Sequence, residues 1–197
     1  MIGCLPAICA DAFEAKLFRA AFSLTFFGCL RLSELLGQGK MIESMGGRQG
    51  LAKKDLLAEF PSVVIRLRGS KTDQGAVGQS IKMASLAGDK TACPVRNLAA
   101  YLAVRPPSTG AIAQHERGLE QLLIHLNGQP LTRSQFQGVV KKAASFLDWP
   151  VEAYSSHSFR IGAATTAALE GASEEKIMKL GRWRSAAFRS YCRRDRV

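Results

Sequence analysis

Histidine is scarce in this sequence of 197 residues, and its three examples, His115, His125 and His157, are far apart. The cysteines number five, which is odd, and no two of them have the Cys-x-x-Cys spacing. Such a set argues against a disulfide framework and against a zinc or other His-based metal site. We therefore predict reduced thiols, an intracellular location and no bound metal.

Long apolar runs are also missing. The longest one near the start covers residues 20–30 and is bounded by Arg19 and Arg31, so it is too short to span a bilayer. Residues 1–10 lack the basic start of a signal peptide. There is no internal repeat and no low-complexity segment. The sequence thus predicts a soluble protein without a membrane association.

Acidic residues are outnumbered, with 16 Asp and Glu against 27 Lys and Arg, a net charge of +11 and a pI of about 9.8. A balance of this kind favours polyanionic partners and says nothing about fold. The charge is uneven, because residues 179–197 hold seven basic residues and one acidic residue, a net of +6. This tail is either an ordinary solvated basic segment or a phosphate-binding one.

Capping residues and apolar spacing predict several helices. Asp11 followed by Glu14 is typical of an N-cap with a capping box, and apolar residues then recur at helical spacing to Phe27. Gly28 interrupts this pattern, which resumes over residues 30–36. Further helices are expected over residues 94–103, 132–146, 155–171, 173–181 and 185–193.

One small β element is predicted among these helices. The β-branched run 63–68 and the segment 79–83 are expected to pair as a hairpin with Lys71 near its tip. Residues 37–55 and 106–118 are expected to be loops, and 119–126 is either a strand or a short helix. The fold class predicted for residues 1–197 is a single, mainly helical domain with a small antiparallel β-sheet (α+β).

Several polar side chains have an ordinary explanation when each is taken alone. His157 and Arg160 share a helix face by their spacing, as a capping histidine and a surface arginine would. Arg31 and Glu34 have the spacing of a surface ion pair. However, Arg31 stands where the helical pattern requires an apolar residue, and a semi-buried arginine needs anionic partners. Trp183, between two arginines, is typical of a half-buried packing residue.

The order of these side chains along the chain is more informative than any one of them. With the series Arg31, Lys71, His157-x-x-Arg160, Trp183 and Tyr191, the chain resembles the catalytic domain of the tyrosine recombinases, the phage-integrase family. The resemblance covers nearly the whole chain and is carried by FFGCLRLSELLG, RGSKTDQG, HSFRIGAATTAALEGAS and IMKLGRWRSAAFRSYCR. The GRW tail and the run CPVRNLAAYL are most similar to Crypton- and DIRS-type recombinases of eukaryotic mobile elements. That origin implies a nuclear location; otherwise the protein is expected in the cytoplasm.

The resemblance implies a role for each motif residue. Tyr191 would attack a phosphodiester and form a 3′-phosphotyrosyl link. Arg31 and Arg160 would stabilise the charge on the non-bridging oxygens in the transition state. Lys71 would protonate the leaving 5′ oxygen, and His157 would act as hydrogen-bond donor or base. The resemblance implies neither a metal nor a cofactor. Religation needs no ATP, because the covalent link conserves the energy of the broken bond.

Two further roles follow from the resemblance. Glu34 would brace the site from behind the arginines. Trp183 would take a position that is His in many members and Trp in others. The usual spacing to the tyrosine is nine, which fits Arg182, whereas Trp183 is eight residues from Tyr191. Either residue can fill the role, and the indole favours Trp183.

The resemblance also implies partners, namely double-stranded DNA and further copies of the chain in a tetramer on that DNA. DNA contacts are expected in the basic tail from Lys179, Arg182, Arg184 and Arg189. The separate N-terminal core-binding domain of the family is expected to be absent.

Two alternatives remain open from the sequence. One is a DNA-binding module without chemistry, because residues 161–181 could form a helix-turn-helix. The other is a type IB topoisomerase, which has related chemistry and different sequence hallmarks.

Overall fold

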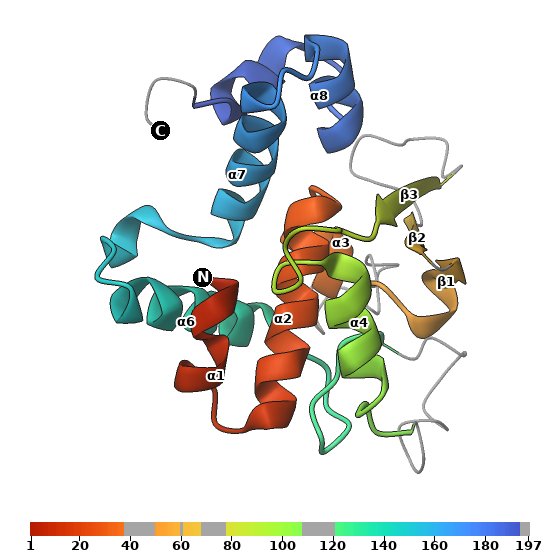
Figure 1. Cartoon of the computed structure of the whole chain (residues 1–197), viewed down its shortest axis with the longest axis vertical. Coiled ribbons are helices and arrows are strands. Elements are labelled where there is room, and N and C mark those ends of the chain that lie inside the picture. The colour runs from red at the N-terminus through yellow and green to blue at the C-terminus, as the bar shows by residue number, and fades with distance from the viewer. Residues whose placement is uncertain (38–49, 60, 68–77, 108–120, 194–197) are drawn as a thin grey trace, which may run out of the picture.

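The structure, a computed structural model, describes residues 1–37, 50–59, 61–67, 78–107 and 121–193. Helix α2 lies at the centre of the main body, with α6 on one side and α4 with the sheet on the other (Figure 1). In chain order the elements are η1 (Ile2–Cys4), α1 (Leu5–Ile8), α2 (Ala12–Phe27), α3 (Leu32–Leu36), η3 (Lys53–Asp55), β1 (Leu56–Glu59), β2 (Ser62–Leu67), β3 (Gln79–Ala84), α4 (Pro94–Leu102), α6 (Arg133–Phe146), η4 (Val151–Ala153), α7 (Ser156–Leu169), α8 (Glu174–Gly181) and η5 (Ala186–Tyr191).

Helix α2 begins where its capping residues predict. The Asp11 carboxylate accepts a hydrogen bond from the Glu14 amide at 2.7 Å, and the Glu14 carboxylate accepts one from the Ala10 amide at 2.6 Å. Phe22 of this helix is fully buried, and its ring centroid lies 5.0 Å from that of Phe136 and 4.9 Å from that of Phe159. These aromatic contacts join α2, α6 and α7 in one core.

The helical conformation is interrupted between α2 and α3, and the prediction that Arg31 lies inside a helix is wrong. Arg31 is the extended N-cap residue of α3, with φ −74° and ψ 144°. The Glu34 carboxylate accepts a hydrogen bond from the Arg31 amide at 2.7 Å, which closes the first turn of α3. Cys29, with a φ of 44°, takes a left-handed conformation in the turn that follows α2. Arg31 therefore lies at the start of α3 and not within a helix.

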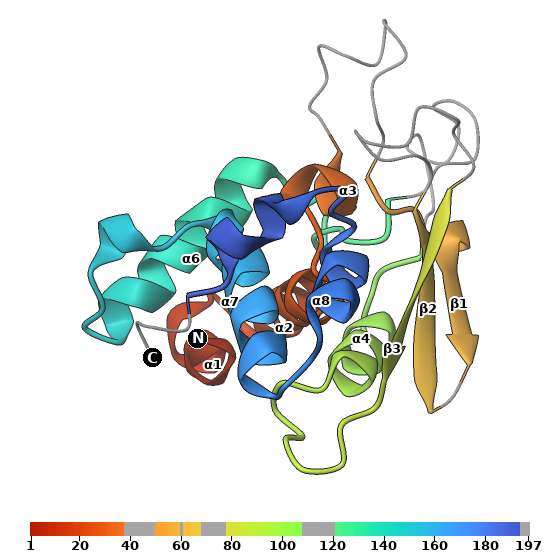
Figure 2. The same ribbon diagram turned by 90° about the horizontal axis from the view of Figure 1, so that it is seen from above.

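The predicted hairpin is present and belongs to a three-stranded antiparallel sheet in the order β1-β2-β3. The register of β2 and β3 runs from Ser62 opposite Ala84 to Leu67 opposite Gln79. Lys71 belongs to the connection between these strands, which lies outside the described residues. Helix α4 packs against the sheet (Figure 2). Of the ambiguous segment 119–126, the described part forms only isolated bridges.

The last three elements form a smaller core of their own around Ala164, Ala168, Ile177 and Phe188. Serine side chains cap all three, as Ser155, Ser173 and Ser185 each accept a hydrogen bond from a backbone amide two or three residues ahead. The last element is a 3₁₀ helix and is shorter than predicted. Figure 1 shows α7 leading out of the main body to α8 and η5. None of the described helices is both long and apolar enough to cross a membrane.

Candidate active site

Arg160 is the buried centre of the candidate site. It lies in the first turns of α7, and only 2% of the residue is exposed. One terminal nitrogen, Nη1, donates to the Cys29 carbonyl, and the other, Nη2, donates to the Gly181 carbonyl at 2.9 Å. Burial and the positive charges of Arg31 and Arg182 lower the pKa of Arg160. A guanidinium has five N–H donors, so three of them are not used by these two bonds.

Two aromatic rings lie at this guanidinium, and a third ring packs on one of them. The Cζ atom of Arg160 lies 4.7 Å from the ring centroid of Trp183 and 5.8 Å from that of Tyr191. The Tyr191 ring lies 4.9 Å from the ring of His157 and 4.9 Å from that of Trp183. Tyr191 therefore contacts both an imidazole and an indole beside a buried positive charge.

Helix α7 also holds the backbone of the tyrosine. The Thr165 hydroxyl donates to the Tyr191 carbonyl at 3.1 Å and accepts from the Arg193 amide at 3.1 Å. Thr165 was not among the predicted site residues. A small polar residue in an apolar helix was its only sequence signal, because its partners are backbone groups.

His157 has a lowered pKa. Partial burial of the ring and the positive charges of Arg160, Arg193 and Arg31 all disfavour the imidazolium. The effect keeps the imidazole neutral at neutral pH, the form that accepts a proton.

Arg31 and Arg182 share the carboxylate of Glu34. Arg31 Nη1 donates to Glu34 Oε1 at 2.9 Å, and Arg182 Nη2 donates to Glu34 Oε2 at 2.7 Å. Burial opposes the ionisation of Glu34, but the charge of Arg182, the Arg31 amide and the charge of Arg31 outweigh it and lower the pKa of Glu34. Glu34 is thus an ionised carboxylate between two guanidiniums.

The four predicted DNA contacts do not share one environment. Lys179, Arg184 and Arg189 are exposed, and Arg189 forms an ion pair with Glu174 at 3.0 Å. Arg182 is instead an internal residue with only 5% of its side chain exposed, and both of its terminal nitrogens donate to protein groups. This engagement does not favour a DNA contact by Arg182, which stays a prediction. Lys71 lies outside the described residues.

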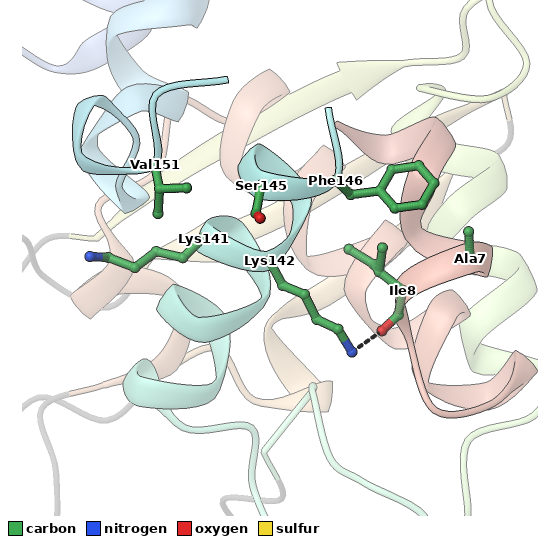
Figure 3. Close-up of a pocket in the computed structure, with 7 residues that line it drawn as sticks. All are labelled: Ala7, Ile8, Lys141, Lys142, Ser145, Phe146 and Val151. Atoms are coloured by element: carbon green, nitrogen blue, oxygen red, sulfur yellow. Dashed lines mark hydrogen bonds between the residues drawn. The ribbon is translucent and has the colours of Figure 1, made fainter. Parts of the chain in front are cut away.

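A shallow cleft lies elsewhere, between α1 and α6 (Figure 3). Lys142 Nζ donates to the Ile8 carbonyl across it. None of its lining residues belongs to the cluster around Arg160. They are Ala7, Ile8, Lys141, Lys142, Ser145, Phe146 and Val151. Among the residues that the structure describes, no three His, Cys, Asp or Glu side chains are grouped to hold a metal ion.

No protein-family model and no curated protein matches the sequence. Solved structures do match. The post-cleavage complex of XerH site-specific recombinase with palindromic difH substrate has a TM-score of 0.68 at 16% identity, over 99% of this chain and 47% of that one. A variant of Tn1549 transposon integrase with transposon right end DNA has a TM-score of 0.61 at 20% identity, over 97% of this chain and 59% of that one.

The chain has the fold of the tyrosine recombinase catalytic domain. The predicted fold class, mainly helical with a small antiparallel sheet, is therefore confirmed. The chain spans about half the length of the XerH protein that it matches. The Crypton- or DIRS-type assignment stays a prediction, since neither matched protein is described as one of that kind.

Proposed function

We propose that this chain is a DNA strand transferase that cleaves and religates double-stranded DNA at specific sites through a 3′-phosphotyrosyl intermediate. The observation that carries the proposal is the position of Tyr191, between His157 and Trp183 and beside the buried guanidinium of Arg160. The fold supports it, because the similar structures are of a site-specific recombinase and a transposon integrase, each bound to DNA.

In the proposed reaction, the phenolic oxygen of Tyr191 attacks the phosphorus. The new O–P bond forms as the bond from phosphorus to the 5′ oxygen breaks. Neutral His157 accepts the phenolic proton, and Lys71 gives a proton to the departing 5′ oxygen. The 5′ hydroxyl of a second DNA end then reverses the step, so ATP and a cofactor are not required.

Charge on the non-bridging oxygens is stabilised by two guanidiniums in this proposal. Arg160 uses the donors that are not bound to backbone carbonyls, and Arg31 reaches the phosphate from the start of α3. Trp183, rather than Arg182, supports the phosphate, since its ring packs on Arg160. Exchange between two duplexes would take four copies of the chain on DNA.

A nicked suicide substrate tests the proposal. On such DNA the short fragment that carries the free 5′ hydroxyl diffuses away after cleavage, so the covalent adduct accumulates and survives denaturation. We expect the native protein to form an adduct that protease reduces to a peptide on the 3′ end, and Tyr191→Phe to bind DNA without forming it.

Other outcomes would support the alternatives. Salt-sensitive DNA binding with no adduct from the native protein would identify a DNA-binding module. Relaxation of supercoiled DNA by the monomer would identify a topoisomerase.

A further inference from the structure

Arg182 is almost fully enclosed by groups of its own chain. It is the C-cap residue of α8, in a left-handed conformation with φ 57° and ψ 39°. Nη1 donates to the carbonyls of Gly28 at 3.1 Å and Leu180 at 3.2 Å. Nη2 donates to the Cys29 carbonyl at 2.9 Å and to Glu34 at 2.7 Å. A DNA phosphate would have to displace a buried ion pair to reach these donors.

The partners of Arg182 are the supports of the two arginines of the candidate site. The Cys29 carbonyl accepts from both Arg182 and Arg160. The Glu34 carboxylate accepts from both Arg182 and Arg31. Arg182 therefore links the turn that anchors one guanidinium to the carboxylate that holds the other.

We propose that Arg182 is a positioning residue that fixes the guanidiniums of Arg31 and Arg160 relative to each other and does not contact DNA. The consequence for DNA cleavage rests on the proposed function. The contacts of Arg182 do not depend on that function, because they join α8, the turn after α2 and the start of α3 within one chain.

The planar fork of arginine is needed for this role. Its two terminal nitrogens reach carbonyls on one side and a carboxylate on the other at the same time. A lysine ammonium is a single point charge, so it can approach Glu34 or the carbonyls of the 28–29 turn but cannot hold both in place. Arg182→Lys is therefore expected to behave as a loss of the link, although the charge is kept.

The kinetic test separates the rate of adduct formation at saturating DNA from the affinity for DNA. For Arg182→Lys and Arg182→Met we expect this rate to fall about 10- to 100-fold, the effect of a misplacement of roughly 1 Å. The dissociation constant and its salt dependence should stay within about twofold of the native values. The exposed neighbour Arg184 provides the contrast, because Arg184→Met should raise the dissociation constant and reduce its salt dependence, the two quantities that the Arg182 variants leave unchanged.

The opposite pattern would overturn the proposal. If Arg182→Lys weakens binding and flattens the salt dependence while the saturated rate is retained, Arg182 is a DNA contact. A native rate and native affinity in Arg182→Met would exclude both roles.

Two measurements on the free protein do not depend on DNA cleavage. In a Trp149→Phe background, Trp183 emission should shift in Arg182→Met. The unfolding midpoint should also be measured for Glu34→Gln, Arg182→Met and the double variant. The shift in the double variant should differ from the sum of the two single shifts. If the native protein forms no adduct, the proposed function fails while these results still decide whether the link exists. Additive midpoints with unchanged emission would refute the positioning role.

Discussion

The guanidinium of Arg160 faces the indole of Trp183, with 4.7 Å between Cζ and the ring centroid. Close packing keeps the indole there, because a Cβ atom at Gly181 would overlap its six-membered ring. The Gly181 carbonyl also accepts from Arg160 at 2.9 Å. One short segment thus positions both the indole and the arginine.

Gly181→Ala should displace Trp183 and destabilise the protein by about 1–3 kcal/mol, since an extra methyl group in a filled space forces neighbours to move. Adduct formation should fall with it. The matched control is Gly138→Ala, in the interior of α6 with open space at the Cβ position, which should stabilise by up to about 1 kcal/mol. Chemical denaturation measures both, and equal stability of the two variants would contradict the packing argument.

Glu34→Gln should change how stability depends on pH. The folded-state pKa of Glu34 lies below the usual 4.5, so the unfolded chain binds the proton first as the pH falls. The stabilisation is therefore complete above about pH 4.5 and is lost as the pH falls through the folded-state pKa. The variant should be less stable at neutral pH by about 1–3 kcal/mol, and the difference should shrink in acid. Free energies of unfolding measured across this range would refute the pairing if the two curves run parallel.

Protonation of His157 should slow cleavage at acid pH. Because the pKa of His157 lies below its ordinary value of 6.5, this loss of rate should begin below pH 6.5. The folded state keeps the imidazole neutral to a lower pH than the unfolded chain does, so the base remains competent as the pH falls past 6.5. At subsaturating DNA, the second-order rate constant for adduct formation reports groups of the free protein. We expect it to be flat from about pH 8 to 6.5 and to fall only below that. His157→Gln should be slower and should lose this fall in rate, whereas a fall retained in the variant would assign the proton to another group.

The sequence predicts the helices best where a side chain closes their first turn. Asp11, Thr132, Ser155 and Ser173 each accept a hydrogen bond at the start of a predicted helix. Local chemistry of this kind is readable from neighbouring residues. Strand β1 was missed because four residues without β-branched side chains carry no strand signal.

The candidate site likewise has a part that the sequence predicts and a part that depends on contacts between distant residues. The chain order of Arg31, His157, Arg160, Trp183 and Tyr191 led to the fold. The inward direction of Arg182 could not be predicted, because its partners include carbonyls 153 and 154 residues away, which any residue type supplies. A basic tail therefore appeared uniform although one of its arginines is internal.

The exposed basic residues of the tail should differ in their effect on DNA affinity. Arg184→Ala should weaken binding and reduce the slope of log affinity against log salt by about 0.9, the change for one lost phosphate contact.

Arg189 forms an ion pair with Glu174 at 3.0 Å, so Glu174→Gln should free Arg189 and tighten DNA binding. Titrations at several salt concentrations test both. A Glu174→Gln variant that binds no more tightly would show that Arg189 does not face DNA.

Thr165 should affect cleavage through the backbone of Tyr191. Its hydroxyl bonds the Tyr191 carbonyl and the Arg193 amide, each at 3.1 Å, and only 7% of the residue is exposed. Thr165→Val keeps the shape and removes both bonds, so the carbonyl and the amide each lose a partner at a cost of about 1–3 kcal/mol. Where the lost bonds stabilise the reactive position of Tyr191, the rate of adduct formation drops about tenfold for every 1.4 kcal/mol.

Thr165→Ser is the matched variant, because it keeps the hydroxyl and removes only a methyl group. Its rate of adduct formation at saturating DNA should remain within a few-fold of native, while that of Thr165→Val falls. The comparison isolates the two hydrogen bonds from general packing, since valine fills the site better than serine does. If Thr165→Ser is the slower of the two, packing of α7 against η5, and not the hydroxyl, holds Tyr191 in place.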